Sequence, residues 1–440
     1  MPKQQSILRR DVIGWSLYDF ANTIFSMNIL SLYFKRWVVE DLQRDGLYYD
    51  LAYAGAMLLT ALFMPALGAL SDHTGKKRLF LFLFTVSCCI AIGIVPLVPE
   101  SLIVVIMLAF AIATFCYEGG MVFYNALLYS VSDGNEARYV SGFGVAMGYL
   151  GSIAGMILVL PWVTGGLFGL NIPWHDAGGK VAAFVPSAVL FMVFAIPVFI
   201  WVKEKPGLVK DRRIPFMKSY AEVWAGIKDT RRYPGVLRFL IADYFFEDAV
   251  ATVILNIGIF SSIVIGLSDA DLTVFLIIST TFAMIGSMLI GHISKRASLK
   301  KTMATIVWGW VIVLLFFIFI EHIILIYCLG CLVGILLGGL WTVSRPLLAE
   351  MVPKDELGRF FGLYSLSGRA AAVIGPVVWG GVVYIFNPSR SGGRFLSDLM
   401  GISESAADKL PYRLAVLSLL AMMMIGLVIF RKLPEHGAEG

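Results

Sequence analysis

The sequence predicts an all-α polytopic membrane protein with twelve transmembrane helices in two six-helix bundles. The first observation is composition: apolar residues make up 58% of the 440 residues and charged residues only 15%. Soluble domains carry about 25% charged residues, so this chain has too few to cover a soluble surface. The second is that apolar runs of about 20 residues recur along the chain. The same composition excludes disordered, collagen-like and disulfide-rich classes.

Twelve apolar runs are long enough to cross a bilayer, and runs of this length satisfy their backbone groups in lipid only as helices. In the first half they are residues 13–34, 51–70, 79–98, 102–131, 140–160 and 181–202. In the second half they are residues 236–265, 272–293, 302–320, 323–351, 360–386 and 414–430.

Basic residues collect in the loops on one side of the predicted spans. These loops include Arg9, Arg10, Lys76, Lys77, Arg78, Arg138, the 203–232 stretch, Lys300, Lys301, Arg431 and Lys432. By the positive-inside rule, these loops and both termini are cytoplasmic. No cleavable signal peptide is expected, and the lack of a usable N-x-[ST] sequon favours a bacterial inner membrane.

One long cytoplasmic connector divides the chain. We therefore expect an N-terminal bundle over 1–203, a linker over 204–235 and a C-terminal bundle over 236–440. Within the linker, apolar residues at helical spacing predict an amphipathic helix on the inner leaflet. They are Phe216, Tyr220, Val223, Trp224 and Ile227. A tether without a role of its own is the alternative.

The two halves repeat one another. Gly142, Gly148 and Gly155 recur at the same intervals as Gly362, Gly368 and Gly375, and a Gly-Gly pair falls at 119–120 and again at 338–339. The loops 68–78 and 291–301 also match. Duplicated six-helix halves are typical of transporters, whose substrate site lies where the repeats meet.

Three short motifs carry a resemblance to a known family. The loop Gly68-Ala-Leu-Ser-Asp72-His-Thr-Gly75-Lys-Lys77-Arg78 resembles the signature loop of the major facilitator superfamily. The segments 18–23 (Tyr-Asp-Phe-Ala-Asn-Thr) and 138–142 (Arg-Tyr-Val-Ser-Gly) resemble its vacuole-effluxer-like branch, best known for autophagy-related amino-acid effluxers. The resemblance covers essentially the whole chain and implies the fold of that superfamily and alternating access.

The resemblance also implies a cytoplasmic gate in the signature loop. There the acid at Asp72 sits near the start of helix eleven, where a carboxylate is favourable, and basic residues help hold the outward-open state. The gate residues are then Asp72, Gly75, Lys77, Arg78 and Arg138. A solvated loop acid is the alternative for Asp72. The second copy has Lys295 and Ser298 in place of the acid and glycine, so an equivalent gate there is doubtful.

Charged residues inside the spans are the candidate functional groups, because each costs about 2.5–3.5 kcal/mol on insertion. The resemblance places helices one, four, seven and ten around the central cavity, with eleven alongside. Predicted substrate-binding residues are Asp19, Asn22, Thr23, Asn125, Trp341, Arg345 and Arg369, and predicted proton-coupling residues are Glu118, Glu247 and Asp248. The alternative for the arginines is neutralisation of acids across the bundle. Asp243 is expected to pair with Arg238.

The remaining chemistry-bearing residues predict no enzyme and no cofactor. The chain lacks a phosphate-binding G-x-x-x-x-G-K-[ST] loop, and its five cysteines all lie in apolar stretches. None of its five histidines lies well inside a span, so no metal site is expected. No nucleic-acid partner is expected, because membrane topology accounts for the positive charge of the cytoplasmic loops.

These observations give the hypothesis of a monomeric secondary transporter for a small zwitterionic or anionic solute, an amino acid first. The proton gradient is the expected driving ion, and the solute and the lipid bilayer are the expected partners. Two rivals remain open: a lipid or lysolipid flippase on the same fold, and a non-transporting membrane receptor or assembly partner.

Overall fold

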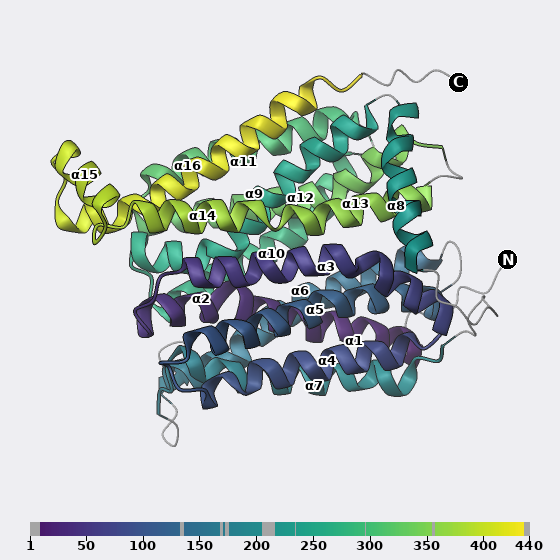
Figure 1. The fold of residues 1–440 in the computed structure, drawn as a ribbon, viewed down its shortest axis with the longest axis horizontal. Coiled ribbons are helices and arrows are strands. Elements are labelled where there is room, and N and C mark those ends of the chain that lie inside the picture. The colour runs from purple at the N-terminus through teal and green to yellow at the C-terminus, as the bar shows by residue number, and fades with distance from the viewer. Residues whose placement is uncertain are drawn as a thin grey trace. The chain divides into compact units, whose positions relative to one another are not determined.

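The computed structural model describes residues 9–132, 136–167, 170–171, 176–204, 216–233, 235–294, 296–353 and 357–434. Over these ranges the regular structure is helical apart from one short antiparallel hairpin, β1 (Gly166–Leu167) with β2 (Leu170–Asn171), in which Gly166 pairs with Asn171. Figure 1 shows long helices running side by side within each half of the chain. The chain is therefore an all-helical membrane protein in its described part.

Helices account for the predicted spans and for the connector. The first half contains α1 (Arg10–Phe25), α2 (Phe34–Arg36), α3 (Leu47–Thr74), α4 (Lys77–Gly93), α5 (Ile103–Val131), α6 (Glu136–Thr164) and α7 (Phe184–Trp201). The connector carries α8 (Phe216–Asp229). The second half contains α9 (Val236–Phe260), α10 (Asp269–Ile293), α11 (Leu299–Phe319), α12 (Ile323–Met351), α13 (Leu357–Ala371), α14 (Ile374–Ile385), α15 (Ser391–Met400) and α16 (Glu404–Arg431).

Among the described residues, eleven helical stretches are long and apolar enough to cross a membrane, one fewer than the sequence predicts. The difference lies in the first span. There α1 ends after 16 residues and continues as the π-helical segments Ser26–Tyr33 and Trp37–Asp41 around the short α2. The side-chain amide of Asn28 donates to the carbonyl oxygen of Ile24 at 2.9 Å, which competes with the regular helical bond at this point.

The helical winding also takes in Lys35 and Arg36, which lie just beyond the predicted end of the first span at residue 34. Both are helical and buried, at 4% and 3% exposure. Arg36 Nε lies 3.1 Å from Glu40 Oε1, and Lys180 Nζ lies 3.0 Å from Glu40 and 2.6 Å from Asp41. Buried charges are tolerated when they are paired in this way.

The eleventh span consists of two helices, α13 and α14, separated by Ala372 and Val373. Pro376 explains the break, because a proline ring clashes with the carbonyl group four residues earlier, here that of Ala372. The break leaves backbone N–H groups at the start of α14 without partners inside the helix.

Contacts divide the chain into two units, Met1–Leu42 with Gly55–Tyr220 and Gln43–Ala54 with Ala221–Gly440. In the first unit, α1 packs on α6 and α7, and α4 packs on α5. In the second unit, α10 packs on α12, and α9 packs on α16 and α13. The division falls inside α8, and it assigns the first two turns of α3 to the second unit.

Glycines bring the helices of each unit close together. A Cβ atom at Gly151 of α6 would strike the backbone of Phe20 in α1, and one at Gly338 of α12 would strike the backbone of Ala283 in α10. Close approach at small residues is a main source of helix association in membranes. Gly155 and Gly375, which match in the sequence repeat, lie against α1 and α9, the first long helix of their respective units.

Replacing Gly151 by alanine is expected to lower the thermal unfolding temperature of the purified protein in detergent. The new Cβ must push α6 away from the backbone of Phe20, a change that costs about 1–3 kcal/mol. Gly142→Ala, on the same helix, is the matched control, because nothing lies within 4 Å of a Cβ at that position. Equal unfolding temperatures for the two variants would contradict the packing argument.

Candidate functional site

Asp19 lies in α1 against a glycine of α6. A Cβ atom at Gly148 would lie 3.6 Å from Asp19 Cγ, so the missing side chain makes room for the carboxylate. Tyr124 of α5 lies near this carboxylate, and its buried hydroxyl group has no hydrogen-bond partner among the described residues. Asp19 is only partly buried, which leaves it reachable by a ligand.

The neighbouring aromatic residues hold Tyr124 in place. The ring of Trp15 stacks on the ring of Tyr124 at 4.6 Å, and Trp15 Nε1 donates to the carbonyl oxygen of Tyr124 at 3.1 Å. The ring of Tyr18 also stacks on the ring of Tyr124, with the two centroids 5.0 Å apart. The hydroxyl group of Tyr18 lies 2.9 Å from that of Thr85. Trp15, Tyr18 and Tyr124 therefore form an aromatic cluster beside Asp19.

The other predicted polar residues of the first unit have different surroundings. Thr23 donates to the carbonyl oxygen of Gly148 at 2.6 Å, which fastens α1 to α6. Asn22 is 3% exposed, and its side-chain oxygen accepts no hydrogen bond from the described residues. Asn125 is exposed and Glu118 half-buried, both on α5. The structure thus brings Asp19 and Thr23 together at Gly148.

Glu247 of α9 is the centre of a second cluster, in the second unit. Trp341 Nε1 of α12 donates to Glu247 Oε2 at 3.1 Å, and the hydroxyl group of Tyr364 on α13 lies 3.5 Å from Oε1. Arg345 of α12 also acts electrostatically on this carboxylate. Two helices, α12 and α13, therefore place two hydrogen-bond donors and a cation around one acid of α9.

Asp243 belongs to the same cluster, contrary to the sequence expectation. Its expected partner, Arg238, donates instead to the carbonyl oxygen of Lys432 at 3.1 Å. Residues five apart on a helix point in different directions, whereas residues four apart share a face. Asp243 is accordingly beside Glu247 and 2% exposed. The spacing of the two acids was the signal in the sequence that could have identified it.

Asp248, the next residue, has a different environment. The backbone N–H of Gly375, at the start of α14, donates to both carboxylate oxygens of Asp248, at 2.8 and 2.9 Å. The carboxylate thus satisfies one of the N–H groups that the helix break leaves open. Asp248 therefore pairs with the backbone of Gly375. Arg369 is half-buried on α13, on the other side of the helix break.

The signature loop lies at the end of α3 predicted to be cytoplasmic. Gly75 follows α3 with φ +64°, a left-handed conformation that favours glycine. Lys77 Nζ donates to the carbonyl oxygen of Ala126 at 3.4 Å, and Arg78 Nη1 donates to that of Val202 at 3.0 Å. The side chains of Asp72 and Arg138 lie outside the described residues, so the expected acid–base contact of the gate is a prediction.

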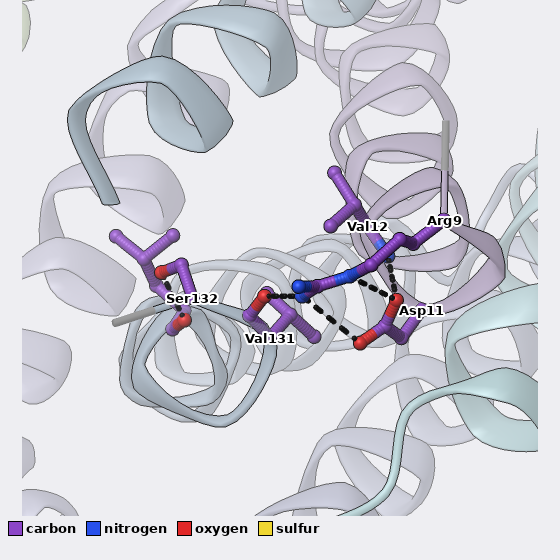
Figure 2. A network of polar contacts seen from close by, with 6 residues as sticks. Arg9, Asp11, Val12, Val131 and Ser132 are labelled. Atoms are coloured by element: carbon purple, nitrogen blue, oxygen red, sulfur yellow. Dashed lines mark hydrogen bonds and ion pairs between the residues drawn. The ribbon is translucent and has the colours of Figure 1, made fainter. Parts of the chain in front are cut away.

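Arg9, which the sequence indicated only as one of the basic residues that set the topology, also makes a contact at this end of the helices. Figure 2 shows its guanidinium group between the Asp11 carboxylate and the carbonyl group of Val131 at the end of α5. The Arg9 Nε to Asp11 Oδ1 distance is 3.2 Å. A cation at a helix C-terminus is stabilising, so Arg9 ties the start of α1 to the end of α5.

Comparison with known proteins gives three results. The family model described as "Vacuole effluxer Atg22 like" matches residues 129–407. An uncharacterized MFS-type transporter of Bacillus subtilis, YxiO, is 24% identical over 430 residues, which cover 96% of this chain and 94% of the relative. Autophagy-related protein 22 of Kluyveromyces lactis is 25% identical over 388 residues, which cover 80% of this chain and 76% of the relative.

Solved structures share the fold. The nucleoside transporter NupG superposes with a TM-score of 0.69 at 14% identity, covering 96% of this chain and 99% of that chain. A bacterial homologue of the human lysosomal transporter Spinster, in an inward-facing and unoccupied conformation, superposes with a TM-score of 0.71 at 12% identity, covering 96% and 95%. At such low identity these likenesses show the fold alone.

Proposed function

Because this chain belongs to the vacuole effluxer Atg22-like family of major facilitator transporters, we propose that it is a proton-coupled secondary transporter of a small zwitterionic or anionic solute. An amino acid is the first candidate, by the family resemblance. We further propose that it works by alternating access as a monomer in a bacterial inner membrane, with both termini in the cytoplasm.

The observation that carries the substrate class is the exposed pair Trp341 and Arg345. They are four residues apart on α12 and therefore on one face, and both are exposed, Trp341 to 44%. A guanidinium group binds a carboxylate through two parallel hydrogen bonds, and the face of an indole ring attracts an ammonium group. This pair suits the two ends of an amino acid.

The other predicted residues complete the proposal. Asp19, Asn22, Thr23, Asn125 and Arg369 are proposed substrate contacts, with Asp19 as the acceptor for an ammonium group. Glu118, Glu247 and Asp248 are proposed for proton coupling. The loop residues Asp72, Gly75, Lys77, Arg78 and Arg138 are proposed as the cytoplasmic gate.

Uptake of a mixed panel of labelled amino acids into proteoliposomes tests the function, with and without an inwardly directed proton gradient. Accumulation that depends on the gradient is the expected result. Amino-acid uptake that does not depend on the gradient would support the substrate class and contradict proton coupling. Absence of flux, with the protein folded and inserted, would contradict the amino-acid assignment and direct the search to organic anions and lipids.

A further inference from the structure

Two carboxyl groups lie one turn apart on α9, the buried Asp243 and the half-buried Glu247. Asp243 and Glu247 are one helical turn apart and interact electrostatically. Asp243 is 2% exposed, and its Oδ1 atom has no hydrogen-bond partner among the described residues. Like charges placed this close in a desolvated site cannot both stay ionised without compensation. The geometry therefore calls for a proton or a cation at this pair.

Among the described residues of the helices packed on α9, Arg345 is the cation that acts on Glu247. α12 contributes Arg345 beside Glu247 and the hydroxyl group of Ser344 beside Asp243. α13 contributes the phenol of Tyr364. α16 offers apolar contacts, since Phe430 packs on Phe246 with ring centroids 5.9 Å apart and Gly426 also faces that ring. With one guanidinium group and two carboxyl groups, the cluster becomes neutral when it holds one proton.

The hydrogen bonds indicate which carboxyl group holds it. Glu247 accepts from Trp341 Nε1 at 3.1 Å and lies 3.5 Å from the hydroxyl group of Tyr364, and Arg345 adds its positive charge. Donors and a cation around a carboxylate favour its ionised form. Asp243 has the orphaned oxygen and the deeper burial, so its charged form is the less favourable one.

We propose that Asp243 is the proton-carrying residue of the transport cycle, that it shares one proton with Glu247, and that Arg345 links this proton to the solute. This inference deepens the proposed function and rests on it for the coupling step. When a solute carboxylate binds Arg345, it offsets the guanidinium charge, so an unprotonated acid pair would carry two uncompensated negative charges. Solute binding therefore favours the state in which Asp243 holds the one shared proton, so solute and proton travel together.

The first test needs no substrate. Purified full-length protein in lipid is titrated with acid and base, and infrared difference spectra record the carbonyl band of a protonated, buried carboxyl group. We expect Asp243→Asn to remove this band, Asp243→Glu to restore a shifted one, and Glu404→Gln, an exposed acid at the start of α16, to leave it unchanged. A band that survives in a folded Asp243→Asn protein would overturn the assignment.

The second test separates the proton from the solute. In proteoliposomes, Asp243→Asn should retain exchange of labelled for unlabelled solute but lose gradient-driven accumulation, which for one coupled proton amounts to about tenfold per pH unit of the imposed gradient. A folded Asp243→Asn protein that accumulates solute like the wild type would overturn the proposal. If the wild-type protein shows the Asp243 infrared band but transports no amino acid, the result supports Asp243 as the proton site and contradicts the amino-acid substrate class.

Discussion

Replacing Arg345 by lysine is expected to raise the KM for solute uptake by about ten- to a hundredfold. A lysine keeps the charge but cannot form the two parallel hydrogen bonds that a guanidinium group gives a carboxylate. A hydrogen bond to a charged group is worth about 1.5–3 kcal/mol, and each 1.4 kcal/mol corresponds to a factor of ten in binding. Initial uptake rates over a range of solute concentrations measure the effect.

Arg413→Lys is the matched control for this experiment. Arg413 of α16 forms an ion pair with Glu321 at 2.8 Å, and the guanidinium group of Arg413 holds the pKa of this exposed carboxyl below its usual value. The contribution of the pair to stability is fully present above the ordinary pKa of a glutamate and is lost as the pH falls through the lowered pKa of Glu321. Uptake by Arg413→Lys should match the wild type at neutral pH. An Arg345→Lys protein with unchanged KM would remove Arg345 from the substrate site.

Replacing Asp248 by alanine should produce the second large effect, on stability. The change removes both acceptor oxygens from the backbone N–H of Gly375, at the break between α13 and α14. A buried donor left without a partner costs about 1–3 kcal/mol. We expect a clear drop in thermal unfolding temperature for Asp248→Ala and a smaller one for Asp248→Asn, which keeps one acceptor oxygen.

Two comparisons separate this structural role from the proposed role of Asp248 in proton coupling. Ser268→Ala removes an exposed helix cap from α10, where the hydroxyl group accepts from the backbone of Asp271 at 3.2 Å, and should cost about 1 kcal/mol. Asp248→Asn should fold. Loss of gradient-driven accumulation in the folded variant is the result expected if Asp248 takes part in proton coupling, and wild-type accumulation would leave it with the capping role alone.

The candidate site was only partly predictable. Intramembrane charges identified Asp19, Glu247 and Arg345 because a charge in a membrane helix is costly and so stands out from its apolar neighbours. The same reasoning could not tell Glu247 from Asp248, which are adjacent in the chain. Their partners, Trp341 and Gly375, are more than 90 residues away, and spacing along the chain carries no information about such contacts.

The sequence alone predicted the membrane class, the family and the eleven spans that the described residues bear out, because lipid demands long apolar helices and the signature loop has fixed residue types. It also placed Gly75 in the signature loop, where glycine readily adopts the left-handed conformation that the structure shows. Only the tertiary structure showed the π-helical continuation of the first helix, the cap that Asp248 forms on α14 and the proximity of Asp243 to Glu247 and Arg345. These depend on which helices pack together, and an acid takes its role from the charges and donors that packing brings to it.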